Sequence, residues 1–202
     1  MKKFIVIAAT CALLGSATAA LAAGDATAGK TKSATCAACH GPDGNSTIAQ
    51  NPKLAGQSAD YLVKQLQEFK SGARVNAIMV GMVAPLSPQD MEDLAAYFAS
   101  QKIVRGETDP ALELPGRDIF RGGNLTSGVS ACMACHGVAG AGNPAAKFPA
   151  LAGQHADYIE AQLKAFRAME RNNDAGQMMR NIAVKMTDPE IKAVSSYIQG
   201  LQ

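Results

Sequence analysis

The second half of this chain repeats the first. Cys-x-x-Cys-His-Gly occurs at residues 36–41 and again 96 positions later at residues 132–137, and Pro-x-Leu-Ala-Gly-Gln occurs at residues 52–57 and 97 positions later at 149–154. Tyr97 and Tyr197 extend the match to the end of each half, at a spacing of 100. Stacked repeat proteins need three or more units, so two copies of about 90 residues indicate duplicated domains rather than a solenoid.

The boundary between the copies is predicted at residues 106–115, where glycine and proline residues cluster. We therefore expect a first domain at residues 23–105, a linker at 106–115 and a second domain at 116–202. Residues 1–22 are predicted to be a cleaved signal peptide, because Lys2 and Lys3 precede an apolar run and the segment ends in small residues. The run at 4–14 is far shorter than the ~20 residues that span a membrane.

Loss of the signal peptide changes the charge and the cysteine count. The formal net charge falls from +2 to zero because Lys2 and Lys3 are removed, and Cys11 leaves with them, so four of the five cysteines remain. Without a basic block, this balance gives no indication of a nucleic-acid partner. A bacterial type of export signal predicts the periplasm, where four cysteines would ordinarily form two disulfides.

The mature chain is predicted to be all-α. Residues 60–70 carry an apolar stripe at helical spacing, and residues 157–166 repeat it. Ser87-Pro88 and Thr187-Asp188-Pro189 supply the capping residue and the early proline of helices that extend to about residues 99 and 199. Strand-like alternation is nearly absent. Small domains with long loops would have thin cores unless a large apolar group lay at the centre of each.

The Cys-x-x-Cys-His motif is typical of covalent haem attachment. On a helical turn the two thiols and the histidine occupy neighbouring positions, so the thiols can bond the two vinyl groups of a haem while the histidine reaches the iron. The two motifs stand at equivalent points of the repeat and use every cysteine of the mature chain. We therefore predict two covalently bound haem c groups. The predicted attachment and iron-binding residues are Cys36, Cys39, His40, Cys132, Cys135 and His136.

Two other interpretations of the motif remain open. A disulfide or a thioredoxin-like dithiol is possible, although the βαβ pattern in which such a dithiol lies is missing. A structural zinc site would need a further strong ligand in each domain. The only other histidine, His155, aligns with Ser58 and has no counterpart in the first half. We expect His155 to be a solvent-exposed residue at the start of a helix.

The repeat also singles out a second iron ligand in each domain. Met79 and Met179 lie 18 residues before Tyr97 and Tyr197, and no other downstream methionine is matched by a methionine in the other copy. Both are expected on the loop before the last helix. A thioether ligand favours reduced iron, and an iron with two protein ligands has no vacant position for oxygen or peroxide. The sites are therefore expected to transfer electrons rather than to catalyse bond chemistry.

With these motifs the whole mature chain resembles the class I cytochromes c, and its two-domain arrangement is similar to that of the cytochrome c4 family. The resemblance implies two all-α cytochrome c domains, each wrapped around one haem, related by a pseudo-two-fold axis and with haem propionates near the domain interface. It also implies that the carbonyls of Pro52 and Pro149 accept a hydrogen bond from Nδ1 of His40 and His136. Such bonds fix the orientation and basicity of a ligand.

The resemblance further implies an electron-transfer protein of the periplasm and not an enzyme. Its expected partners are a quinol-oxidising complex that supplies single electrons and a terminal oxidase that accepts them. We expect a monomer with at most peripheral membrane association. Two alternatives remain. One is an electron-accepting cytochrome subunit of a larger periplasmic dehydrogenase, and the other is a dihaem peroxidase-type enzyme, which would need an iron that is open or exchanges its ligand.

Overall fold

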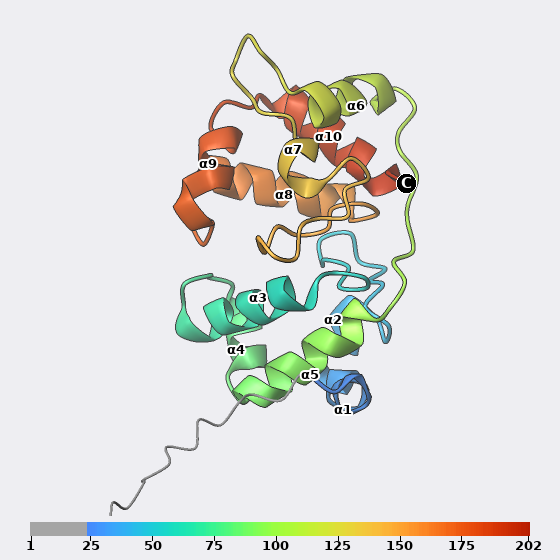
Figure 1. The fold of residues 1–202 in the computed structure, drawn as a ribbon, viewed down its shortest axis with the longest axis vertical. Coiled ribbons are helices and arrows are strands. Elements are labelled where there is room, and N and C mark those ends of the chain that lie inside the picture. Colours follow the sequence, from blue (N-terminus) through green and yellow to red (C-terminus); the bar gives the residue numbers. More distant parts are fainter. Residues whose placement is uncertain (1–23) are drawn as a thin grey trace, which may run out of the picture.

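The computed structural model describes residues 24–202, which form two helical domains joined by one extended segment (Figure 1). Within these residues the only β-pairing is two isolated bridges, between Asn124 and Val129 and between Asn143 and Phe148. The predicted all-α fold is therefore confirmed. The predicted signal peptide, residues 1–22, lies outside the described residues. None of the helices described is both long enough and apolar enough to cross a membrane.

Each domain contains the same succession of helices. The first domain comprises α1 (Ala26–Lys32), the 3-10 turn η1 (Ser33–Thr35), α2 (Ala37–His40), α3 (Ala59–Ser71), α4 (Ala77–Val83) and α5 (Pro88–Ala99). The second comprises α6 (Glu113–Gly122), α7 (Met133–His136), α8 (Ala156–Arg167), the 3-10 turn η2 (Ala175–Gln177), α9 (Met178–Ala183) and α10 (Asp188–Gly200). The four predicted helices correspond to α3, α5, α8 and α10 to within one residue at either end.

The last helix of each domain begins at a capping box. Ser87 Oγ accepts a hydrogen bond from the N–H of Asp90 at 3.1 Å, and the Asp90 carboxylate accepts one from the N–H of Ser87 at 2.8 Å. Thr187 and Glu190 repeat the exchange at 3.4 and 2.8 Å. Each helix also has a proline in its first turn, where a backbone N–H would have no partner within the helix, so no helical hydrogen bond is lost. The helix starts that the sequence predicted are therefore stabilised by local contacts.

The first and last helices of each domain cross at a glycine. Helix α1 packs against α5, and Gly29 lies at the crossing; α6 packs against α10, and Gly116 lies there. A Cβ atom at either glycine would clash with a backbone carbonyl oxygen of the opposite helix, that of Asp93 or of Ala193. The two glycines therefore allow the terminal helices to approach more closely than larger residues would permit.

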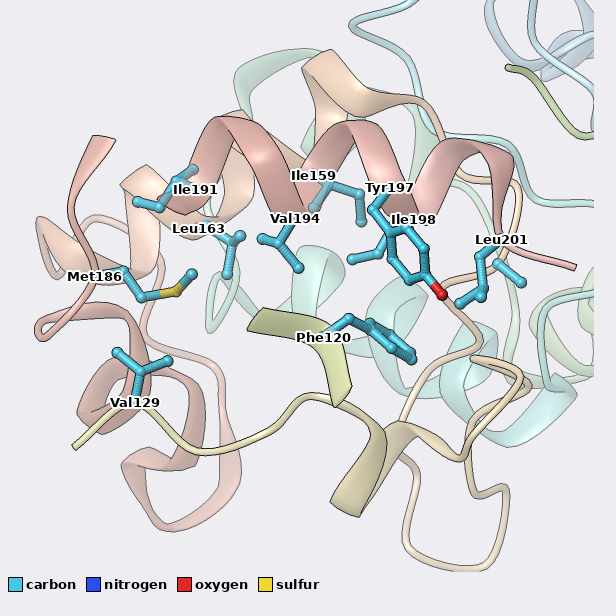
Figure 2. Close-up of a cluster of buried hydrophobic side chains, with 11 residues drawn as sticks. Phe120, Val129, Ile159, Leu163, Met186, Ile191, Val194, Tyr197, Ile198 and Leu201 are labelled. Atoms are coloured by element: carbon cyan, nitrogen blue, oxygen red, sulfur yellow. The ribbon is translucent and has the colours of Figure 1, made fainter. Parts of the chain in front are cut away.

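The two hydrophobic cores differ in size. In the second domain, buried side chains from α6, α8 and α10 form one large cluster around Phe120, Val194 and Tyr197 (Figure 2). The buried members of the corresponding first-domain cluster are Leu62, Leu94, Ala95, Tyr97 and Phe98. So small an apolar cluster agrees with the expectation that a further large apolar group completes the domain.

The segment between the domains packs along α10. Residues 102–109 have no regular secondary structure. Gly106 donates its N–H to the carbonyl of Gln199 at 3.1 Å, and Asp109 donates its N–H to Ser196 Oγ at 3.0 Å. Helix α6 begins at Glu113, so the last three residues of the predicted linker 106–115 lie in its first turn. The connecting segment is thus bound to the second domain rather than free between the two.

Candidate functional sites

In both domains the Cys-x-x-Cys-His motif forms a short helical turn. The carbonyl of Cys36 accepts hydrogen bonds from the N–H groups of Cys39 and His40, at 3.2 and 3.0 Å. The carbonyl of Cys132 accepts the equivalent bonds in the second domain at 3.3 and 3.0 Å. The glycine after each motif ends the turn with a φ of 80° or 81°, which glycine adopts most readily. The two thiols and the histidine therefore lie on neighbouring positions of one turn, as haem attachment requires.

All four thiols of the described residues are unpaired. Cys36 and Cys132 are partly buried against the domain cores, whereas Cys39 and Cys135 are exposed. Burial raises the pKa of the Cys36 thiol, and it raises the pKa of Cys132 to about 11. A redox-active dithiol needs a thiol with a lowered pKa. These surroundings therefore do not favour dithiol chemistry.

Each motif histidine is buried and bonded to a proline carbonyl. His40 Nδ1 lies 2.8 Å from the oxygen of Pro52, and His136 Nδ1 lies 2.9 Å from the oxygen of Pro149. Because a carbonyl can only accept, Nδ1 carries the proton and Nε2 keeps its lone pair for a metal. Burial lowers the pKa of both rings, so the neutral form that binds metals is favoured at neutral pH.

Met79 and Met179 lie on short helices and not on loops. Met79 belongs to α4, whose first turn is capped by the side chain of Asn76, and Met179 belongs to α9. Both methionines are partly buried, and Met179 packs against the same core cluster as Cys132. The expectation of a loop was wrong because packing against α3 and α8 stabilises helices that are too short to be stable alone.

The other methionines of these regions are of two kinds. Met91 and Met186 are buried in the cores, where an adaptable side chain fills space. Met82, Met169 and Met178 are exposed. None of the five has a methionine at the equivalent position of the other domain.

His155 makes an interdomain contact that the sequence analysis did not predict. The side chain is partly buried, and its Nε2 donates to the carbonyl of Ser46 in the first domain at 2.8 Å. Burial lowers its pKa. The expectation of a solvent-exposed residue was wrong because the other domain covers this helix start. Residues 24–202 contain no cluster of three or more His, Cys, Asp or Glu side chains that could hold a metal ion.

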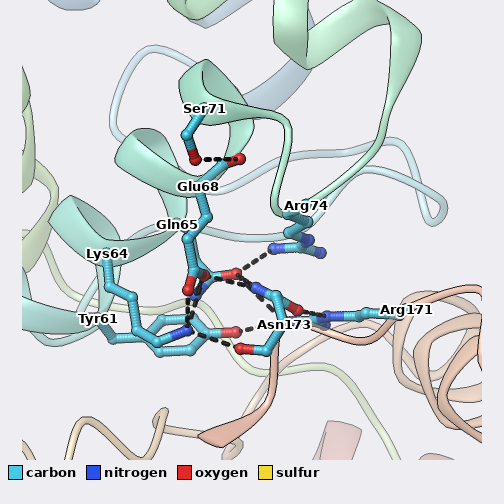
Figure 3. Close-up of polar contacts among 8 residues, drawn as sticks. All are labelled: Tyr61, Lys64, Gln65, Glu68, Ser71, Arg74, Arg171 and Asn173. Carbon is cyan, nitrogen blue, oxygen red and sulfur yellow. Dashed lines mark hydrogen bonds and ion pairs between the residues drawn. The ribbon is translucent and has the colours of Figure 1, made fainter.

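Two arginines, Arg74 and Arg171, meet in a polar network at the domain boundary (Figure 3). Arg74 donates to the hydroxyl of Tyr158 at 2.9 Å and to Gln162 Oε1 at 3.0 Å, both in the second domain. Arg171 donates to the hydroxyl of Tyr61 in the first domain at 2.9 Å. The arginines and the tyrosines are each 97 residues apart. Equivalent residues of the two copies therefore exchange equivalent bonds, as a pseudo-two-fold axis requires.

The guanidinium groups of Arg74 and Arg171 have only neutral hydrogen-bond partners. Their bonds go to phenol and amide oxygens, and no carboxylate in residues 24–202 forms an ion pair with either. The nearby Glu68 is already paired with Lys64 at 2.7 Å. Partly buried cations are costly without an anion. A haem propionate, which thioether attachment leaves free, would supply the negative charge that these two cations lack among the described residues.

Comparisons with known proteins agree with this arrangement. The family model for cytochrome c matches residues 26–102 and 119–202. Cytochrome c4 of Stutzerimonas stutzeri is 52% identical over 198 residues, covering 93% of this chain and 94% of the relative. The crystal structure of reduced recombinant cytochrome c4 from Pseudomonas stutzeri matches with a TM-score of 0.87 and 51% identity, over 89% of this chain and 100% of that one. A thiosulfate dehydrogenase electron acceptor of Thiomonas intermedia is 38% identical, over 98% of this chain and 90% of the relative.

These similarities and the two Cys-x-x-Cys-His turns establish the cofactor. The chain carries two covalently bound haem c groups, one in each domain. The thiols that are available for the thioether bonds are those of Cys36, Cys39, Cys132 and Cys135.

Proposed function

Because this chain belongs to the cytochrome c family, within its two-domain cytochrome c4 group, we propose that it carries single electrons from a quinol-oxidising complex to a terminal oxidase in the periplasm. In this proposal each iron has one histidine and one methionine ligand, His40 with Met79 and His136 with Met179. That the chain is an electron carrier follows from its family, and the ligands, the direction of transfer and the compartment are what we propose.

The observation that carries the proposal is that both domains present the same set of donor atoms. Each has a buried, neutral histidine whose Nδ1 is bonded to a carbonyl, so that Nε2 is the available donor. Each also has a partly buried methionine at the equivalent place, on α4 or α9. Two protein ligands leave no open position for an exogenous substrate, which suits electron transfer.

Different residues attach the haem, orient its histidine ligand and set its reduction potential. The cysteines fix the cofactor to the turn, the proline carbonyl orients the histidine, and the thioether of Met79 or Met179 favours the reduced state. The haem supplies the one-electron chemistry. The histidine of each site is buried, and the first cysteine of each motif, Cys36 or Cys132, is partly buried.

The respiratory role is tested by rapid mixing with isolated membranes. The reduced protein is expected to be oxidised by membranes that contain terminal oxidase but not when the oxidase is inhibited. The oxidised protein is expected to be reduced by the quinol-oxidising complex and quinol. If neither assay shows electron exchange faster than the inhibited control, the respiratory role is rejected. The electron-carrier chemistry would not be affected by that result.

A second candidate function is supported by one group of relatives. In this candidate a periplasmic dehydrogenase, rather than a quinol-oxidising complex, reduces the chain, and the similarity to a thiosulfate dehydrogenase electron acceptor supports it. The rapid-mixing assay discriminates between the two donors, because reduction by thiosulfate and its dehydrogenase, without reduction by the quinol-oxidising complex, would favour the second candidate.

A further inference from the structure

The peptide group that orients His40 is also bonded to the other domain. The carbonyl of the Pro52–Lys53 peptide accepts from His40 Nδ1 at 2.8 Å. The N–H of that same peptide donates to Oε1 of Gln154, in the second domain, at 2.8 Å. A continuous chain of hydrogen bonds therefore runs from Gln154 through one peptide group to the histidine of the first domain.

The second domain contains the reciprocal chain. The carbonyl of the Pro149–Ala150 peptide accepts from His136 Nδ1 at 2.9 Å, and its N–H donates to Oε1 of Gln57, in the first domain, at 2.8 Å. Gln57 and Gln154 are the last residues of the repeated Pro-x-Leu-Ala-Gly-Gln segment. Each domain thus places the glutamine of its own repeat against the peptide group that accepts the histidine N–H of the other domain.

Both glutamine side chains are fixed by further bonds. Gln154 Nε2 donates to the carbonyl of Lys53 at 2.8 Å, and Gln57 Nε2 donates to the carbonyl of Ala150 at 2.9 Å. The same two Oε1 atoms accept the N–H of the next residue, Ser58 or His155, at 3.0 and 3.1 Å. Gln57 and Gln154 are only 7% and 6% exposed. Because N–H donors surround each oxygen, the amide can take only the orientation that continues the chain.

A bond to the N–H side of a peptide makes its carbonyl a better acceptor, because hydrogen bonds in series polarise one another. A stronger acceptor at Nδ1–H makes the imidazole a more basic ligand, which stabilises oxidised iron. We propose that Gln57 and Gln154 are positioning residues that act across the domain boundary, each lowering the reduction potential of the haem in the opposite domain. The proposal rests on the axial role of His40 and His136.

The proposal is tested with Gln57→Leu and Gln154→Leu in the full-length holoprotein. Gln57→Leu is expected to raise the potential of the second-domain haem, and Gln154→Leu that of the first-domain haem. The expected change in the reduction equilibrium constant is roughly threefold, which at ~59 mV per tenfold is about 28 mV. Each haem is followed by NMR of partly reduced protein, with its thioether signals assigned through the neighbouring cysteine residues.

Gln65→Leu is the matched control. Gln65 is another buried glutamine of the interface, 5% exposed, but its Oε1 bonds to Arg74, Arg171 and Asn173 and not to a proline peptide. Because Gln65 bonds to the arginines of both domains, Gln65→Leu should affect the two haems alike and show no crossed pattern. The proposal is overturned if Gln57→Leu shifts the first-domain haem as much as the second, or if Gln154→Leu shifts the second-domain haem as much as the first.

A second variant keeps the test valid if the leucine side chains separate the domains. Gln57→Glu retains an acceptor oxygen for the N–H of Ala150, so the second-domain haem should keep its potential or lower it. A higher reduction potential of the second-domain haem in Gln57→Glu would contradict the proposal. If the proposed iron ligands are wrong, the wild-type protein will lack the absorption band of thioether-bound iron. If only the proposed role of the glutamines is wrong, that band will be present and unchanged.

Discussion

Met79→Ala and Met179→Ala are each expected to remove roughly half of the weak long-wavelength absorption that a thioether gives to ferric haem, because each domain supplies one of two such ligands. The reduction potential of the altered haem should fall by on the order of 0.1 V or more, within the ~0.8 V range that axial ligands span. The altered iron should also bind carbon monoxide when reduced. Absorption spectra and a redox titration of each variant measure all three effects.

The adjacent exposed methionines provide the controls. Met82→Ala alters a side chain of α4, and Met178→Ala alters the residue before Met179. Both variants should keep the full absorption band and both potentials. If Met178→Ala removes half of the band and Met179→Ala does not, the ligand of the second domain has been assigned to the wrong residue.

Gly116→Ala is expected to destabilise the second domain strongly, because it places a methyl group in the close crossing of α6 and α10. The new Cβ would overlap the carbonyl oxygen of Ala193 and crowd Tyr197 Cβ at 2.7 Å, so α6 and α10 must move apart. Forcing extra atoms into a packed contact typically costs about 1–3 kcal/mol. Thermal and denaturant unfolding of the holoprotein, followed by circular dichroism, measures the loss.

Gly122→Ala is the matched control on the same helix. Apart from its chain neighbours and the backbone of its own helix, no atom lies within 4 Å of the Cβ position at Gly122. The substitution should therefore be neutral or should stabilise the helix by about 0.4–1 kcal/mol. Equal unfolding midpoints for Gly116→Ala and Gly122→Ala would mean that the close helix crossing contributes nothing to the stability of the domain.

Much of the fold could be predicted because its signals are local. The starts of α5 and α10 are marked by Ser87 and Thr187 with prolines beside them, and the side chains that cap these helices do so within three residues. The amphipathic pattern of α3 and α8 identifies their buried faces. Haem attachment is equally local, because two thiols and a histidine within five residues suffice to define it.

The features that escaped prediction depend on contacts between distant residues. Helices α4 and α9 are one or two turns long and take their stability from α3 and α8, so no periodic pattern reveals them. His155 is partly buried because Ser46 of the other domain lies against it. Arg74 and Arg171 could have been noticed in the sequence, because they are identical residues at the repeat spacing of 97. Their position at the domain interface could not be predicted from that spacing.

The claim at the centre of this account is that both haem irons are closed by protein ligands and serve only to hold and release electrons. Exposure of the fully reduced wild-type protein to carbon monoxide tests it most directly. The absorption spectrum is expected to stay unchanged, and subsequent oxidation is expected to release one electron per haem. Rapid formation of a carbon monoxide complex in both domains would show open iron sites and would contradict the account.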